Sequence, residues 1–221
     1  MATSLKIDFV SDVSCPWCAI GLSALELALQ RLGDDVAVDL HFQPFELNPR
    51  MPPGGQDITE HLLQKYGASP EQQAENREAI RQRGVALGFV FRKEGRGRIY
   101  NTFDAHRLLH WAGLPGTWPA GLQAALKKAL LQAYFSRGEC PESHEVLLRL
   151  VGEVGLDQTR AREILAGNEY ADAVRERERY YTDAGIHSVP AVIINDRHLI
   201  SGGQPVEVFE QALRQIAAEQ A

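Results

Sequence analysis

Two hydrophobic periods follow one another at the start of the chain. In "LKIDFV" (residues 5–10) apolar and charged positions alternate, which is the period of a β-strand. From Pro16 the leucines at 22, 25, 29 and 32 repeat every three or four residues, and Gly33 stands where a helix would end. "VAVDLHF" (residues 36–42) alternates again. The pattern predicts strand, helix and strand, and the crossover rule predicts a right-handed parallel unit.

The end of the chain predicts a hairpin followed by a helix. "VPAVII" (residues 189–194) is a β-branched run, the "ND" after it is a turn signal, and "RHLIS" (residues 197–201) offers a second strand. From Val206 a closing helix places apolar residues 209, 213 and 216 on one stripe and runs close to the C-terminus. Pro190 removes a ladder donor from the first strand, so it marks an edge, a bulge or a cis peptide bond.

The chain between these ends is predicted to be almost entirely helical. A Pro- and Gly-rich stretch, "LNPRMPPGGQ", separates it from the first strands, and residues 89–99 are predicted to form a loop with some extended character. Amphipathic spacing predicts helices at 57–66, 69–87, 102–112, 119–136, 143–154, 158–166 and 169–184. The two ends together predict one four-stranded mixed sheet. We therefore expect an N-terminal half (1–48), a helical insertion (49–175) and a C-terminal half (176–221).

Composition and charge narrow the function classes. The 221 residues are 44% hydrophobic, which suits a globular core. A formal net charge of -6 and a pI near 5.7 argue against nucleic acid or an acidic membrane surface as a partner. No stretch approaches the roughly 20 apolar residues that span a bilayer, and no basic leader or apolar signal core precedes the first strand. We expect a cytoplasmic protein.

The most informative motif is "CPWC", in which Cys15 and Cys18 stand between the first strand and the first helix. Pro16 suits the first helical position, so Cys15 is the expected N-cap residue. There its sulfur faces unsatisfied backbone amides and the positive end of the helix dipole, which lower the pKa of the thiol. Cys18 lies one turn later on the same face, within reach of a disulfide, and is expected to be more buried.

Such a pair can carry out thiol–disulfide exchange without a metal or an organic cofactor. Two incidental core cysteines and a zinc site are the alternatives. Structural zinc usually needs four ligands, whereas the only other thiol is Cys140 and the seven histidines show no ligand-like spacing. Trp17 between the thiols is expected to be exposed, either contacting a partner polypeptide or packing on a neighbouring loop.

The chain resembles the DsbA-like branch of the thioredoxin superfamily, and more narrowly its cytoplasmic FrnE-type members. "CPWC" after a first strand, "SVPAVII" entering a late hairpin, "PFELNP" (residues 44–49) and "NTFDAHRLLHWA" (residues 101–112) carry the resemblance, which covers nearly the whole chain. It implies a thioredoxin fold with a large all-helical insertion between its βαβ and ββα halves. It also implies that Cys15 attacks, that Cys18 resolves, and that the peptide bond preceding Pro190 is cis.

The same resemblance implies a substrate site around the thiols. The Val189 backbone would pair with an extended substrate segment, as in β-augmentation. Asn101, His106 and Arg107 match insertion positions that face the dithiol cleft, although each is equally well explained as a surface or cap residue. Asp12 lies near the thiols, and a turn-forming Asp explains it nearly as well. Some relatives carry a second cysteine pair, whereas here only Cys140 lies in the insertion, where a structural thiol is the simpler interpretation.

We therefore expect a protein-disulfide oxidoreductase of reductase or isomerase type, since a reducing cytoplasm disfavours net oxidation. Protein or peptide disulfides would be its substrates, and glutathione, as co-substrate, or the thioredoxin system would recycle it. One alternative is a glutathione-dependent enzyme similar to kappa-class transferases and 2-hydroxychromene-2-carboxylate isomerases, which usually have a serine in place of Cys15. Another is a binding protein with a vestigial or regulatory dithiol. A basic stretch contains Arg92, Lys93, Arg96 and Arg98, which either hold a glutathione carboxylate or an acidic partner or form a solvated loop.

Overall fold

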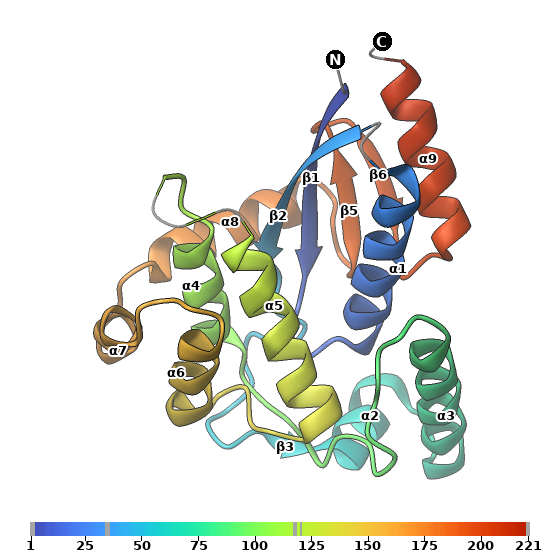
Figure 1. The fold of residues 1–221 in the computed structure, drawn as a ribbon. Coiled ribbons are helices and arrows are strands. Elements are labelled where there is room, and N and C mark those ends of the chain that lie inside the picture. Colours follow the sequence, from blue (N-terminus) through green and yellow to red (C-terminus); the bar gives the residue numbers. More distant parts are fainter. Residues whose placement is uncertain (1–2, 34–35, 117–118, 120, 220–221) are drawn as a thin grey trace.

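A four-stranded mixed sheet forms the centre of the molecule (Figure 1). The computed structural model describes residues 3–33, 36–116, 119 and 121–219. The strand order is β2-β1-β5-β6. β1 is parallel to β2 and antiparallel to β5, and β5 is antiparallel to β6. The four strands are β1 (Thr3–Ser11), β2 (Val36–Pro44), β5 (Ala191–Ile194) and β6 (His198–Ser201). The prediction of one mixed sheet from both ends of the chain is confirmed.

Helices α1 (Pro16–Leu32) and α9 (Val206–Ala218) pack against each other beside this sheet (Figure 1). The alternating residues Leu5, Ile7 and Phe9 of β1 belong to the same buried cluster as the apolar stripes of both helices. Gly33, with a φ of 60°, ends α1 as predicted. The alternation of β1 and the helical periods of α1 and α9 therefore meet in one core.

The chain between β2 and β5 is mainly helical, as predicted. Its two short strands, β3 (Gln56–Asp57) and β4 (Arg98–Ile99), pair with each other, so the predicted loop at 89–99 contains a strand. The helices are α2 (Ile58–Tyr66), α3 (Pro70–Ala86), α4 (Phe103–Ala112), α5 (Leu122–Gln132), α6 (His144–Glu153), α7 (Gln158–Ala166) and α8 (Ala171–Asp183). α4, α5 and α8 contact β2. The insertion is thus packed against the sheet.

Most predicted boundaries differ from the structure by one or two residues, and two differences affect the interpretation. The predicted helix at 119–136 is α5 followed by one π-helical turn, η2 (Ala133–Arg137), and its residue 120 lies outside the described residues. The first strand of the hairpin begins at Ala191 rather than Val189, so Pro190 precedes the ladder and costs it no donor. None of the helices in the described ranges is long and apolar enough to cross a bilayer.

Candidate active site

The two sulfurs of the CPWC motif lie where α1 begins. Cys15 is the N-cap residue of α1 and Pro16 takes the first helical position, as predicted. The Cys15 residue is 4% exposed and Cys18 is fully buried, which confirms the predicted order of burial. Both are free thiols. The neighbouring Trp17 is 40% exposed, so the motif presents an aromatic ring to solvent.

The pKa values of the two thiols move in opposite directions. The hydrogen bond with the Cys18 thiol is the largest influence on Cys15 and lowers its pKa; burial opposes this, and the nearby amides of Cys18 and Trp17 lower it further. Burial raises the pKa of Cys18 well above its ordinary value, and the Cys15 sulfur adds to that rise. The lowered pKa of Cys15 agrees with the prediction, but the second thiol contributes more than the helix end.

The peptide bond between Val189 and Pro190 is cis, as the resemblance implies. It lies against the dithiol, because the Cys15 thiol donates to the Val189 carbonyl oxygen at 3.6 Å. Gly21 makes the close approach of α1 to this bond possible: a Cβ added there would lie 2.9 Å from Cγ of Pro190. Residues far apart in the sequence therefore form one site.

Asp12 lies beside Cys15, whose amide donates to the Asp12 carbonyl oxygen at 3.3 Å, and His106 lies beside Asp12. Asp12 is buried and accepts hydrogen bonds from the amides of Ser14 (3.1 Å) and Leu47 (2.8 Å) and from the Ser14 hydroxyl (2.9 Å). Nε2 of buried His106 is 3.6 Å from Oδ1 of Asp12, and among the described residues that nitrogen has no hydrogen-bond partner. Both interpretations of Asp12 hold, since it shapes the loop before α1 and its charge acts on Cys15.

The buried carboxylate of Asp12 is expected to make the free energy of unfolding depend on pH in the acid range. Burial alone would raise its pKa, but His106 and the backbone amides of Leu47 and Ser14 outweigh burial and lower it to about 2. The unfolded carboxyl titrates near 3.8. Because the folded pKa is the lower one, the carboxylate stabilises the fold above about pH 4, and this contribution of about 2 kcal/mol disappears as the pH falls through about 2.

Denaturant unfolding at pH 6 and pH 2.5 tests this expectation. The wild-type chain should lose more free energy of unfolding over that interval than Asp12→Asn, which carries no titrating group at this position. Equal losses in the two proteins would show that Asp12 does not titrate in this way.

Lys127 is a site residue that sequence reasoning missed. Its α5 side chain is buried, and no hydrogen bond or ion pair holds its ammonium group among the described residues. Burial lowers the pKa of Lys127, against the charges of Cys18, Asp12 and Cys15. With His106 it lines a cavity of about 250 Å³. Its position in the sequence could have indicated burial, because Lys127 stands three and four residues before the buried Leu130 and Leu131 and so shares their helix face.

Asn101 and Arg107 have structural partners that do not include the thiols. The side-chain oxygen Oδ1 of Asn101 accepts a hydrogen bond from the Phe103 amide (2.9 Å) at the start of α4. This contact agrees with the alternative that Asn101 caps a helix. The prediction that Arg107 faces the dithiol cleft is wrong. Its guanidinium binds the carbonyl oxygens of Glu169 and Gly167 and the Asp104 carboxylate, so it ties α4 to the connection between α7 and α8.

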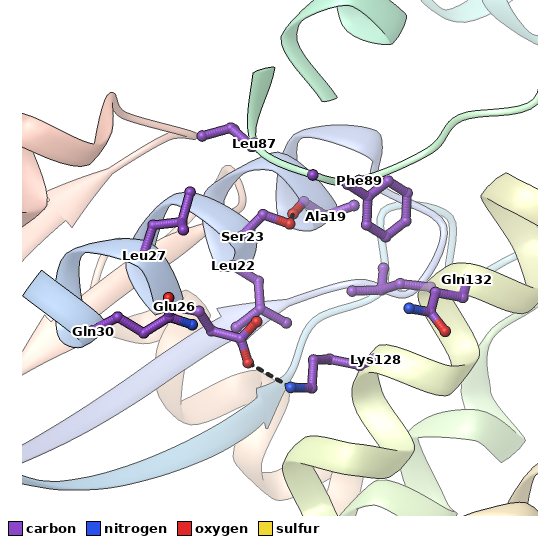
Figure 2. A pocket seen from close by; sticks show the side chains of 12 residues that line it. Ala19, Leu22, Ser23, Glu26, Leu27, Gln30, Leu87, Phe89, Lys128 and Gln132 are labelled. Carbon is purple, nitrogen blue, oxygen red and sulfur yellow. Dashed lines mark hydrogen bonds and ion pairs between the residues drawn. The ribbon is translucent and has the colours of Figure 1, made fainter. Parts of the chain in front are cut away.

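Two other features lie apart from the dithiol. A hollow of about 280 Å³ lies between α1, α5 and the segment that follows α3. Figure 2 shows side chains that line it and the ion pair between Glu26 and Lys128. The charged atoms of this pair are 2.9 Å apart. Neither sulfur lines this hollow or the cavity beside Lys127 and His106. In the described residues, no three His, Cys, Asp or Glu side chains are arranged to hold a metal ion. Cys140 is a half-buried free thiol.

Residues 6–214 match the DSBA-like thioredoxin domain, so the chain belongs to this family. A probable DsbA oxidoreductase from Streptomyces coelicolor is 33% identical, with a TM-score of 0.87 over 98% of this chain and 91% of that one. The family identifies the class as thiol–disulfide oxidoreductases, and the free cysteine pair provides the groups this class requires.

Two more distant structures share the fold. A 2-hydroxychromene-2-carboxylate isomerase is 14% identical, with a TM-score of 0.72 over 97% of each chain. The cytosolic disulfide reductase DsbM from Pseudomonas aeruginosa, in a structure with glutathione, is 19% identical, with a TM-score of 0.63 over 95% of this chain and 98% of that one. At these identities the likeness establishes the fold alone.

Proposed function

We propose that this chain reduces or isomerises disulfide bonds in polypeptides through the Cys15–Cys18 dithiol. The observation that carries the proposal is the pair of free thiols at the start of α1, with the Cys15 sulfur 3.6 Å from the Val189 carbonyl oxygen beside the cis peptide bond to Pro190. The opposite directions of the two pKa shifts agree with it. A thiolate is the attacking species in exchange, so the thiol with the lowered pKa suits the first attack. The buried Cys18, one turn later, suits resolution of the product.

The reaction has two exchange steps. The Cys15 thiolate attacks one sulfur of the substrate disulfide, and the other sulfur leaves as a thiolate. The Cys18 thiolate then attacks the Cys15 sulfur, which closes a Cys15–Cys18 disulfide and releases the second substrate thiol. Two electrons pass from the dithiol to the substrate. A thiol reductant, either glutathione or the thioredoxin system, returns them, and no metal or organic cofactor takes part.

The site supports a role for the groups around the thiols. Because the Cys15 thiol reaches the Val189 carbonyl, a substrate disulfide on Cys15 would lie beside the backbone of Val189 and Pro190, where an extended segment can pair. Exposed Trp17 would contact that segment. His106 would act through Asp12, whereas Asn101 would only support α4. A cytoplasmic location is part of the proposal, because a reducing compartment favours reductase or isomerase chemistry over net oxidation.

The competing function is a glutathione-dependent isomerisation, because the isomerase described above shares the fold over 97% of each chain. A reaction without net redox change needs no resolving thiol. The paired cysteines of this chain favour exchange instead.

A trapping experiment tests the proposal. With reduced glutathione present, the wild-type chain should reduce insulin disulfides catalytically. When the reduced Cys18→Ser variant is mixed with insulin without glutathione, it should accumulate a mixed disulfide that mass spectrometry locates on Cys15. Cys140→Ser is the matched control and should keep wild-type turnover. Wild-type protein without insulin turnover, together with glutathione-dependent conversion of 2-hydroxychromene-2-carboxylate, would replace the proposal by the competing function.

A further inference from the structure

The rim of the dithiol carries two arginines that have no carboxylate partner. Arg96 donates from Nη1 to the carbonyl oxygen of Ser14, the residue before Cys15, at 2.9 Å. Arg83 donates from Nη2 to the Gly203 carbonyl oxygen (2.9 Å). Neither forms an ion pair within the described ranges, although the chain contains 29 acidic residues and has a net charge of -6.

Both guanidinium groups are held in place by aromatic rings as well. Arg83 lies 5.4 Å from the ring of Trp17, inside the CPWC motif. Arg96 lies 5.6 Å from the ring of Phe135 and 5.9 Å from that of Tyr134. Backbone carbonyls and π-faces fix the guanidinium planes but do not neutralise their charge. Both arginines are only half-buried, so they keep donors for a ligand.

The surroundings of these cations suit a polypeptide. Trp17, whose ring lies against Arg83, is 40% exposed. Exposed aromatic rings next to unpaired arginines are typical of surfaces that bind peptide side chains. Glutathione offers carboxylates but no apolar side chain for these rings.

We propose that Arg83 and Arg96 select polypeptide disulfides whose cysteines are flanked by acidic residues. The inference rests on the proposed exchange function and names its substrate class. Arg96 binds the carbonyl oxygen of Ser14, which precedes Cys15 in the sequence. Arg83 lies over the ring of Trp17, which follows Cys15, so each arginine contacts the chain on a different side of the attacking residue. Carboxylates on both sides of a substrate cysteine would pair with them, steering the disulfide toward Cys15.

Matched peptide disulfides test this inference. Fluorogenic peptides with two Glu residues beside the cysteine are compared with otherwise identical peptides carrying Gln or Lys, and with oxidised glutathione. The wild-type chain should attack the Glu peptide about tenfold faster than the Gln peptide at low ionic strength, and the ratio should shrink as salt is added. The double variant Arg83→Gln/Arg96→Gln should bring the ratio to within about twofold.

Two control proteins separate specific pairing from net charge and from misfolding. Arg81→Gln/Arg98→Gln changes the net charge equally, two residues away in each segment; Arg81 pairs with Glu78, and Arg98 binds the carbonyls of Gly54 and Gly55. This control should keep the tenfold ratio. Arg83→Lys/Arg96→Lys retains both charges and should keep most of it.

Each contrary result has its own meaning. Equal rates for all peptides in the wild-type chain, or a ratio that survives in Arg83→Gln/Arg96→Gln, would overturn the inference and leave the exchange function standing. If the double variant attacked only oxidised glutathione more slowly than the wild-type chain does, the arginines would bind glutathione rather than acidic polypeptides. That result would likewise overturn the inference. No attack on any disulfide would instead remove the proposed function.

Discussion

Cys15→Ser is expected to lower the rate of insulin reduction at neutral pH by at least about 1,000-fold, equivalent to about 4 kcal/mol of transition-state stabilisation. The reason is chemical, since a serine hydroxyl neither ionises near neutral pH nor forms a disulfide. The fold should survive, because serine is among the preferred N-cap residues and Cys15 occupies the N-cap of α1.

The loss of turnover is measured on this variant, and the pKa of Cys15 is measured on the wild-type chain. Steady-state turnover gives the loss, with Cys140→Ser as the control that retains every group of the dithiol. Alkylation of Cys15 across pH should follow a pKa below that of an ordinary thiol, because the Cys18 thiol and the neighbouring amides stabilise the thiolate against the cost of burial. Wild-type turnover in Cys15→Ser would remove Cys15 from the chemistry.

Lys127→Met is expected to slow the second exchange step roughly tenfold or more, because the variant loses the charge that favours the Cys18 thiolate. The charge of Lys127 lowers the pKa of the Cys18 thiol, against burial, which raises it. Without that charge less Cys18 thiolate is present to displace the substrate. Methionine has a similar length and an apolar stem, so it can fill the space of the buried side chain.

The measurement is the decay of a mixed disulfide formed on Cys15, followed across pH. In Lys127→Met the rate profile should move to higher pH, while the first attack by Cys15 should change less. Lys128→Met is the matched control, because its side chain is 47% exposed and pairs with Glu26 across the hollow in Figure 2. Equal decay in the two variants would disprove a specific effect of Lys127.

The sequence predicted the secondary structure and the reactive pair because both are local. The alternation of β1, the leucine repeat of α1 and the Gly33 stop each depend on neighbours within a few residues. Pro16 at the first helical position makes Cys15 the N-cap for the same reason. Local prediction failed at the ends of helices and strands. A π-helical turn takes the place of the end of the predicted helix at 119–136, and β5 begins after Pro190.

Only the tertiary structure decided what surrounds the thiols. Arg107 sits one residue from His106, yet the helical step directs the two side chains to different partners, one to the α7–α8 connection and the other to Asp12. In the sequence, Lys127 resembles any charged residue on the surface of a helix. The structure shows that α5 packs on β2 and that Lys127 is buried. The sequence by itself determined the elements and the dithiol, because local periodicity encodes them; packing across more than 100 residues brought Val189 to Cys15 and assembled the site.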